Sequence, residues 1–364
     1  MKGLRPEEGP VRKGNISLGE LTESEMELPA GQAKNIFGQL DRNLRQIEDA
    51  LHVSIIPRGG IVKIRGRRED VAETMQVLST LRILAERGGD ISTQQVTYAL
   101  TAQGGEERAS LLSADEDIII HTAAGRPVKP KTPGQKRYVD SIRDNMITFG
   151  IGPAGTGKTY LAMAMAIRAF RAEEVTRIIL TRPAIEAGEK LGFPPGDLQS
   201  KIDPYLRPLY DALYDIMGAE AFMKHSERGE IEVAPLAYMR GRTLDNAFII
   251  LDEAQNTTPS QMKMFLTRIG FGSRVVVTGD RTQKDLPSGT VSGLDVAARV
   301  LGRLDEIGFS ELTYRDVVRH PLVQKIVEAY ESYEKRESGR VRARAVHAAG
   351  RRGPDGHRMD REHL

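Results

Sequence analysis

The first hundred residues show two helical and two strand-like hydrophobic patterns. Between residues 35 and 51, apolar side chains recur at helical spacing, which predicts an amphipathic helix. Residues 52–56 and 61–65 instead alternate around a Pro-Arg-Gly-Gly turn, which predicts a β-hairpin. Residues 71–85 return to the helical spacing. We therefore expect a small α+β module with an α-β-β-α order over residues 29–100.

The second half of the chain has a different pattern, in which short apolar runs alternate with helical stretches. The runs, each ending at polar residues, are 146–150, 177–180, 247–251 and 274–278. Runs that are apolar throughout are typical of strands buried on both faces, as in a parallel sheet covered by helices. The pattern predicts an α/β domain, to which we assign residues 133–333.

The remaining segments lack these patterns. Residues 1–28 have no periodicity, and we expect them to be disordered. Residues 101–132 contain Gly, Ser and Pro clusters, which predict a linker with one short strand near residues 118–121. Residues 334–364 are basic and poor in large apolar side chains, which predicts a disordered tail. Such a tail is either simply solvated or makes a weak nucleic-acid contact.

The composition narrows the classes of function. The 364 residues carry 52 Lys and Arg against 50 Asp and Glu, a net charge of +2. A pervasively basic nucleic-acid binder is therefore excluded, while a local basic patch is not. Cysteine is absent, which excludes disulfides, iron–sulfur clusters, zinc ribbons and thiol nucleophiles. The longest apolar run, about residues 160–167, is too short to span a bilayer, so we expect no membrane segment.

The strongest chemical signal follows the first apolar run. It is a complete G-x-x-x-x-G-K-[ST] string with a helical stretch behind it, made of Gly152, Pro153, Ala154, Gly155, Thr156, Gly157, Lys158 and Thr159. Strand, glycine-rich loop and helix in this order predict a P-loop. Glycines let backbone N–H groups turn towards phosphate oxygens, Lys158 supplies charge for the β- and γ-phosphates, and Thr159 can bind Mg²⁺.

The third and fourth apolar runs end in residues that a P-loop enzyme needs. Asp252 and Glu253 directly follow the third run. We expect Asp252 to hold Mg²⁺ through water and Glu253 to polarise the attacking water. At the end of the fourth run, Thr278 or Gln283 could contact the γ-phosphate and couple it to motion. Ligands of α/β sheets bind at the carboxyl ends of parallel strands, so we expect these residues to face the P-loop.

Together these strings resemble those of superfamily 1 helicase-type ATPases, in which DEAQ and GDxxQ motifs accompany the P-loop. The chain more closely resembles the PhoH-like family of bacterial ATPases. The stretches that carry this resemblance are 152–159, 181–184, 190–209, 235–244, 250–256, 278–283 and 316–320. The resemblance implies a single RecA-like core, with a parallel sheet flanked by helices. The module before it resembles a small KH-like domain, with its α-β-β-α order and the Ile-x-Gly ending of residues 64–66. It also implies ATP binding, ATP hydrolysis, an RNA-related role and a cytoplasmic location.

The same resemblance points to two further assignments. In helicase-like ATPases a glutamine before the P-loop reads adenine, and Gln135 stands at that place; the alternative is an exposed residue at a helix start. KH domains clamp the RNA backbone with a GXXG loop, whereas the corresponding residues 38–41 read Gly-Gln-Leu-Asp. Another basic surface is formed by Arg58, Lys63, Arg65, Arg67 and Arg68. RNA binding by this module and a role in packing or oligomerisation are both open.

One catalytic group is missing from these strings, a transition-state arginine, which accelerates phosphoryl transfer by about 10³–10⁵-fold. Two-lobed helicases take it from a second core domain, but residues 133–333 leave room for one core only. The arginine must then come from the same core or from a neighbouring subunit, so we predict a ring-like homo-oligomer. The candidates are Arg182, Arg240, Arg242, Arg315 and Arg319.

The sequence leaves two functions to compare. The first is a Mg²⁺-dependent ATPase that couples hydrolysis to RNA binding or remodelling in a helicase-like manner. The second is an ATP-dependent switch with slow hydrolysis that recruits another enzyme, for which family analogy names a ribosome-maturation endoribonuclease. A guanine-reading [NT]KxD string is missing, which favours ATP over GTP. The DEAQ and GDxxQ strings argue against a third function, a small-molecule kinase.

Overall fold

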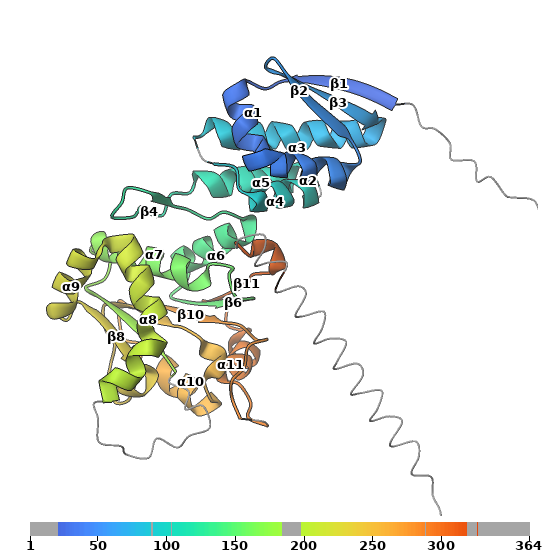
Figure 1. Cartoon of the computed structure of the whole chain (residues 1–364). Helices are drawn as coiled ribbons and strands as arrows, with labels where there is room; N and C mark the ends of the chain where they lie inside the picture. The colour runs from blue at the N-terminus through green and yellow to red at the C-terminus, as the bar shows by residue number, and fades with distance from the viewer. Residues whose placement is uncertain are drawn as a thin grey trace, which may run out of the picture. The chain divides into compact units, whose positions relative to one another are not determined.

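The computed structural model describes residues 21–318 apart from 89, 103, 184–197 and 288, together with residue 326. For residues 198–205 only the backbone is described. The chain divides into two compact units, Met1–Val317 and Val318–Leu364, and the elements below belong to the first unit (Figure 1). The predicted tail lies outside the described residues. No helix in the described part of the chain is long and apolar enough to cross a membrane.

An antiparallel sheet with helices packed on one face forms the N-terminal module (Figure 1). Its elements are β1 (Leu21–Glu27), α1 (Ala30–Phe37), α2 (Arg42–Leu51), β2 (Ser54–Arg58), β3 (Ile61–Arg67), α3 (Arg68–Glu86), α4 (Thr93–Thr101) and α5 (Gly105–Glu116). The three strands lie in the order β1-β3-β2. The predicted hairpin is β2–β3, which turns at Gly59 and Gly60, both with positive φ. Alternation along the strands buries Ile55, Val62 and Ile64 in the core.

The first strand corrects the expected N-terminal boundary of this module. Residues 21–27, which the sequence pattern assigns to a disordered segment, pair with β3 along their whole length. Leu28 behind them is 1% exposed. Met26 is the member of this strand that packs on the core, so the strand has almost no hydrophobic pattern of its own. Its order comes from pairing with a strand that is distant in sequence.

The predicted helix over residues 35–51 is in fact two helices. Gly38, Leu40 and Asp41 have φ values of 72°, 54° and 54°, and a right-handed helix cannot continue through such a conformation. Leu40, expected on the buried face, is 91% exposed. Gly38 was the one sign of this break in the sequence. The apolar residues keep helical spacing on both sides of it, so the pattern predicted one continuous helix.

The expected linker over residues 101–132 is structured in its first half. Leu111 of α5 is 1% exposed and belongs to the core of the N-terminal module. Arg108 of α5 is buried and forms an ion pair with Glu73 of α3. The N-terminal module therefore extends to Glu116, beyond its predicted end at residue 100.

A six-stranded parallel sheet with helices on both faces forms the second part, as the strand pattern predicts. Its elements, with the two-stranded ribbon that precedes them, are β4 (Ile120–His121), β5 (Pro127–Val128), α6 (Pro133–Asp144), β6 (Ile147–Ile151), α7 (Lys158–Arg171), β7 (Arg177–Arg182), α8 (Leu198–Met217), α9 (Ala219–Glu227), β8 (Ile231–Pro235), β9 (Ala247–Leu251), α10 (Pro259–Leu266), β10 (Arg274–Gly279), α11 (Gly293–Leu301) and β11 (Ile307–Glu311). The strand order is β11-β6-β10-β9-β7-β8. Every pairing within it is parallel.

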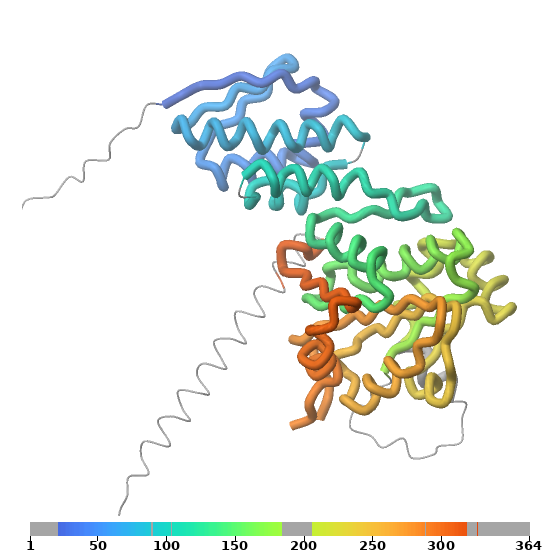
Figure 2. The backbone as a smooth tube through the Cα atoms, turned by 180° about the vertical axis from the view of Figure 1, so that it is seen from behind, coloured from blue at the N-terminus to red at the C-terminus, as the bar shows by residue number. Residues whose placement is uncertain are grey.

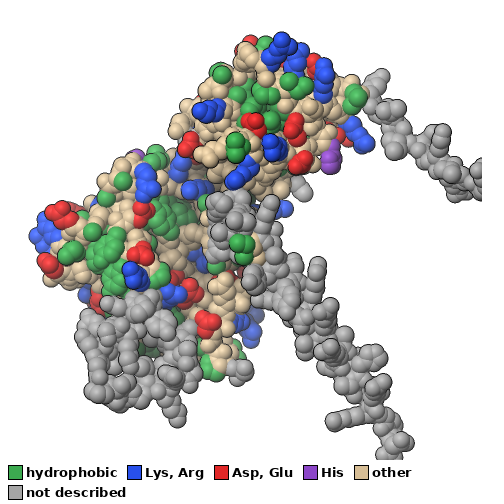
Figure 3. All heavy atoms as spheres, viewed as in Figure 1, with side chains coloured by type: hydrophobic (Ala, Val, Ile, Leu, Met, Phe, Trp, Pro, Cys, Tyr) green, Lys and Arg blue, Asp and Glu red, His purple; other side chains and the backbone are tan. Residues whose placement is uncertain are grey.

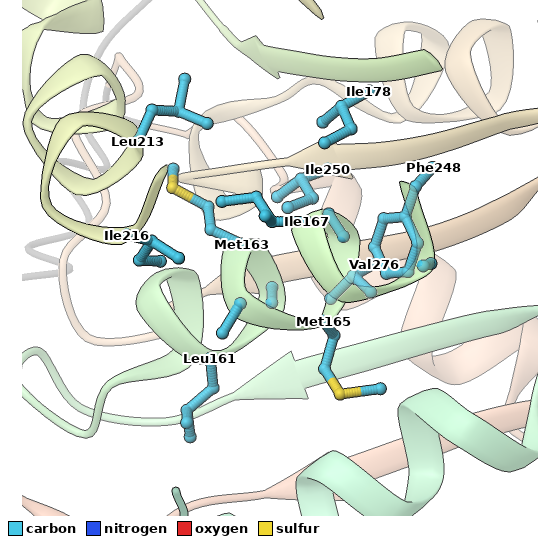
Figure 4. Close-up of a cluster of buried hydrophobic side chains, with 14 of the residues drawn as sticks. Leu161, Met163, Met165, Ile167, Ile178, Leu213, Ile216, Phe248, Ile250 and Val276 are labelled. Carbon is cyan, nitrogen blue, oxygen red and sulfur yellow. The ribbon is translucent and has the colours of Figure 1, made fainter. Parts of the chain in front are cut away.

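Both faces of this sheet are covered. Helices α6 and α7 lie on one face and α10 and α11 on the other, as Figures 1 and 2 show from opposite sides. Strand β9 is buried at every position, which explains its uninterrupted apolar run. Met163 and Ile167 of α7 belong to the same buried cluster as Ile250 of β9 and Val276 of β10 (Figure 4). This packing holds the start of α7 at the carboxyl ends of the strands.

Candidate nucleotide-binding site

The P-loop string follows β6 and runs into the first two residues of α7, as the sequence predicts. Gly155 and Gly157 have φ values of 84° and 77°, a region that side chains disfavour, so these glycines let the loop turn its N–H groups inward. Lys158 is 8% exposed. Its Nζ donates to the carbonyl oxygens of Gly152 at 2.7 Å and Pro153 at 2.8 Å. The ammonium therefore lies against the loop, where it can exchange these carbonyls for phosphate oxygens.

Two hydroxyls converge on one carboxylate oxygen beside the P-loop. Thr159 donates to Oδ1 of Asp252 at 2.7 Å, and Thr278 donates to the same oxygen at 2.6 Å. Asp252 is 6% exposed. Hydroxyl and carboxylate oxygens are ligands that suit Mg²⁺, so Thr159 and Asp252 fit the predicted metal site. Thr278, a candidate for a γ-phosphate contact, instead holds Asp252.

Glu253 follows this carboxylate in a strained backbone conformation. Its φ is 53°, a left-handed conformation that costs a residue other than glycine about 1–3 kcal/mol. Both carboxylate oxygens have partners, because Arg182 approaches Oε1 at 3.2 Å and Gln255 donates to Oε2. Burial, and after it the charge of Asp252, raises the pKa of Glu253. A carboxylate with a raised pKa is a stronger base, which suits a group that polarises water.

Asp280 is hydrogen-bonded to the P-loop, a role that the sequence did not reveal. It follows β10 and is 5% exposed. Its Oδ2 accepts from the backbone N–H of Ala154 at 3.0 Å. In addition, the N–H of Gly152 donates to the carbonyl of Gly279 at 3.1 Å, so the loop and the end of β10 are joined twice. An acid directly after a buried strand is the same signal that identified Asp252.

Gln255 is a second residue of the site that the sequence did not reveal. Its contacts also bear on the role expected of Gln283. Gln255 is fully buried, and its amide contacts Glu253, Asp280 and Gln283. Gln283, expected to sense the γ-phosphate, has an exposed side chain and contributes its carbonyl oxygen to this network. The structure therefore does not bring the Gln283 side chain into the site. The DEAQ string contains Gln255, but the string does not reveal its partners.

Gln135 is 4% exposed, which excludes the alternative of an exposed residue at a helix start. Its Oε1 accepts from the N–H of Lys131 at 2.7 Å, and its Nε2 donates to the carbonyl of Thr156 at 3.0 Å. The amide thus links the segment before α6 to the P-loop. The oxygen can accept one more hydrogen bond and the nitrogen can donate one more. The amide therefore keeps a donor and an acceptor for the predicted adenine contact.

The candidate arginines differ in their contacts. Arg182, at the end of β7, lies against the carboxylate that follows β9. Arg242 makes a two-point ion pair with Glu232 of β8 at 2.6 and 2.7 Å. Arg319 lies outside the described residues. The exposed candidates are Arg240 and Arg315.

The predicted basic surface of the N-terminal module is partly neutralised. Lys63 lies 2.6 Å from Glu25, and Arg65 lies 2.5 Å from Glu23. Both glutamates belong to β1, the strand that the sequence pattern did not reveal. Figure 3 shows acidic and basic side chains interspersed over the visible face of this module. The other members of the basic surface are exposed, namely Arg58, Arg67 and Arg68.

Comparisons with known proteins identify the family. The family described as PhoH-like protein matches residues 127–331. The PhoH-like protein of Mycobacterium tuberculosis is 54% identical over 334 residues, which cover 90% of this chain and 94% of that protein. The PhoH-like protein of Bacillus subtilis is 52% identical over 300 residues, 82% of this chain and 94% of that protein. A solved structure of Pif1 helicase from Candida albicans covers 50% of this chain and 40% of that chain at 15% identity, with a TM-score of 0.27, a likeness too low to bear on function. The chain belongs to the PhoH-like family.

Proposed function

We propose that this chain is a Mg²⁺-dependent ATPase that couples ATP hydrolysis to RNA binding or remodelling. One observation carries the proposal: the P-loop with Lys158, the Thr159–Asp252 pair and Glu253 all lie at the carboxyl edge of one sheet. A phosphate cradle, ligands for a hard cation and an adjacent carboxylate are the parts that transfer of a phosphoryl group to water requires. Membership of the PhoH-like family supports a P-loop nucleotide-binding protein.

In this proposal each residue has a separate task. The P-loop N–H groups and Lys158 bind the β- and γ-phosphates. Thr159 and Asp252 hold Mg²⁺, which when bound neutralises charge that develops on the phosphate oxygens. Glu253 accepts a hydrogen bond from the attacking water and orients it. Gln135 donates to the carbonyl of Thr156 in the P-loop, and we assign the adenine contact to its amide.

The N-terminal module supplies the RNA part of the proposal. Its first elements follow the order β1-α1-α2-β2-β3-α3. Residues 38–41 turn between two helices, where a KH-like domain carries its backbone-clamping loop. Asp41 repels phosphate, so we assign the RNA contact to exposed basic residues, of which Arg58 and Arg67 are examples. A cytoplasmic location is part of the proposal and rests on the family resemblance.

A second function is an ATP-dependent switch that recruits a ribonuclease or a ribosome-maturation factor, and one observation favours it. Arg182 pairs with the Glu253 carboxylate, while Lys158 donates to carbonyls of its own loop. These contacts must be exchanged before water and phosphate can take their places. Because the exchange must precede hydrolysis, it lowers the rate of hydrolysis. A slow rate is what a switch that uses hydrolysis as a timer requires.

Steady-state ATP turnover with and without structured RNA separates the two functions. The first predicts stimulation by RNA of more than a few fold, whereas a flat and slow rate supports the switch. Glu253→Gln is the control, because it keeps the size of the side chain and removes the base. It should lower turnover by about 10²–10⁴-fold while ATP binding persists. A wild-type protein that neither binds adenine nucleotides nor hydrolyses ATP would refute both functions.

We also propose that a neighbouring subunit of a ring-like homo-oligomer supplies the missing arginine. Glu253→Gln subunits keep every arginine, and Arg315→Ala subunits keep the glutamate, so a mixed ring contains some intact sites. Recovery of turnover on mixing supports a shared site. If mixing with variants of all five candidates in turn restores nothing, the shared site is refuted; they are Arg182, Arg240, Arg242, Arg315 and Arg319.

A further inference from the structure

We propose that Gln255 is a positioning residue for ATP hydrolysis, which holds the Glu253 carboxylate towards the nucleotide and ties it to the P-loop. This inference rests on the proposed ATPase function, and the role differs from the γ-phosphate contact that was expected of Gln283. Gln255 acts through Glu253 and through backbone groups, and it does not itself contact the nucleotide.

The side-chain amide of Gln255 uses both of its N–H donors and its oxygen in hydrogen bonds. A primary amide has two N–H groups and one carbonyl oxygen. Its Nε2 donates to Oε2 of Glu253 and to the carbonyl of Gln283 at 3.1 Å, and its Oε1 accepts from the N–H of Asp280 at 3.0 Å. The residue is 0% exposed. A buried amide with all three bonds made has one orientation, because any rotation leaves buried polar groups without partners.

The position of Gln255 is itself held by its surroundings. Its backbone carbonyl oxygen accepts from the hydroxyl of Ser292 at 2.8 Å. A Cβ placed on Gly279 would lie 3.0 Å from Oε1 of Gln255, so the glycine leaves just enough space for the amide. Ser292, directly before α11, therefore holds the backbone of Gln255, and Gly279 at the end of β10 borders its side chain. A rigid support of this kind is what a positioning residue requires.

Glu253 depends on such a support. A glutamate side chain has three rotatable bonds, and a water-orienting carboxylate must be held to within a fraction of an ångström. Arg182 contacts Oε1 and Gln255 contacts Oε2, so the carboxylate has one partner on each oxygen. Arg182 is the last residue of β7 and its partner can change when a nucleotide brings in phosphate charge. Gln255 is buried and keeps its contact, so it sets the direction of the carboxylate.

The same amide connects Glu253 to the phosphate-binding loop. The N–H of Asp280 donates to Gln255, and the carboxylate of Asp280 accepts from the N–H of Ala154 in the P-loop. A continuous chain of hydrogen bonds thus runs from Glu253 through Gln255 and Asp280 to Ala154. A displacement of the loop on binding phosphate is transmitted along this chain to the carboxylate.

The test compares Gln255→Glu and Gln255→Met with a matched neighbour, Asn256→Asp. Gln255→Glu keeps the acceptor for Asp280 and removes both donors, and Gln255→Met keeps the length without any polar group. Asn256 is 6% exposed, lies on the same turn and pairs with Asp285 at 2.9 and 3.3 Å. Asn256→Asp weakens the pairing of this turn with Asp285 and leaves the side-chain contacts of Glu253 unchanged.

We expect both Gln255 variants to lower kcat by about 10- to 100-fold, since misplacing a catalytic group by about 1 Å has this effect. The KM for ATP and the affinity for a non-hydrolysable ATP analogue should stay within about two-fold of wild type, because no phosphate contact is removed. The affinity for ADP–aluminium fluoride, which mimics the transition state, should fall with kcat. Asn256→Asp should keep kcat within about two-fold even where its thermal midpoint falls.

A double-mutant cycle decides whether Gln255 acts through Glu253. In a Glu253→Gln background, Gln255→Met should lower kcat by less than about two-fold, because the carboxylate that it positions is gone. Equal losses in both backgrounds overturn the inference, and so does wild-type kcat in folded Gln255 variants. A fall in analogue affinity that matches the fall in kcat also overturns it. Loss of turnover in Glu253→Gln with normal turnover in the Gln255 variants refutes this inference and leaves the ATPase function standing.

Discussion

Replacing Thr278 by valine removes one hydroxyl from the predicted metal site and keeps the shape of the side chain. The Thr278 hydroxyl is fully buried and donates to Oδ1 of Asp252 at 2.6 Å. Thr159 donates to the same oxygen at 2.7 Å. The substitution therefore leaves Asp252 with one of these two donors and puts a methyl group against a buried carboxylate.

The expected cost follows from the type of hydrogen bond. A bond to a charged group contributes about 1.5–3 kcal/mol to stability, so we expect a loss of about 2 kcal/mol. For a domain of about 200 residues, each kcal/mol lowers the thermal midpoint by about 2–4 °C, which gives about 4–8 °C. The carboxylate also loses the group that orients it. Removing such a group from a metal ligand lowers metal affinity or activity by about 10–100-fold.

Two measurements check this prediction, a thermal melt and ATP turnover as a function of Mg²⁺ concentration. Thr278→Val should need about 10–100-fold more Mg²⁺ for half-maximal turnover. Thr148→Val is the matched control, since Thr148 is also 0% exposed, lies on the neighbouring strand β6 and donates to the neutral carbonyl of Ser141 at 2.9 Å. The control should lose about 0.5–1.5 kcal/mol and keep the wild-type Mg²⁺ dependence. Identical Mg²⁺ curves for the two variants would refute the role of Thr278.

Three further substitutions test other parts of the structure. Lys158→Ala should abolish binding of a fluorescent ATP analogue and ATP turnover while the circular dichroism spectrum stays unchanged; unaltered affinity would disprove the phosphate cradle. Gly150→Ala would place its Cβ 2.5 Å from the ring of Tyr138, an overlap that costs about 1–3 kcal/mol; an unchanged thermal midpoint would show that the ring can move aside. Glu25→Gln removes the charge that lies 2.6 Å from Lys63, so RNA affinity should rise and depend more steeply on salt; an unchanged salt dependence would argue against RNA contact at this face.

Local chemistry explains why the P-loop could be located from the sequence. Its residues are consecutive, and each type has a reason that holds within the loop: glycines for positive φ, Lys158 for charge and Thr159 for the metal. Asp252 and Glu253 could be located from the sequence for a related reason. A strand buried on both faces is apolar, so the first acids after it mark its end. The parallel sheet followed from the same apolar runs.

The errors in the N-terminal module have a physical cause in the pairing of distant segments. Strand β1 carries few apolar residues, and pairing with β3 and ion pairs such as Glu25–Lys63 order it. Helix α5 was assigned to a linker because of its Gly and Ser residues, yet Arg108 and Leu111 attach it to the core. A pattern along the chain records which positions are apolar, and it does not record which distant segment will supply the partner.

By itself the sequence determined the class of fold, the P-loop and the acids that follow β9, because burial and phosphate binding constrain residue types locally. The tertiary structure alone decided which side chains share hydrogen bonds. Asp280 and Ala154 are 126 positions apart, and Gln255 and Asp280 are 25 apart. A side-chain hydrogen bond spans about 3 Å, so its partner depends on the order of strands in the sheet. No hydrophobic period along the chain encodes that order, which is why Gln255 and Asp280 emerged as parts of the site only from the fold.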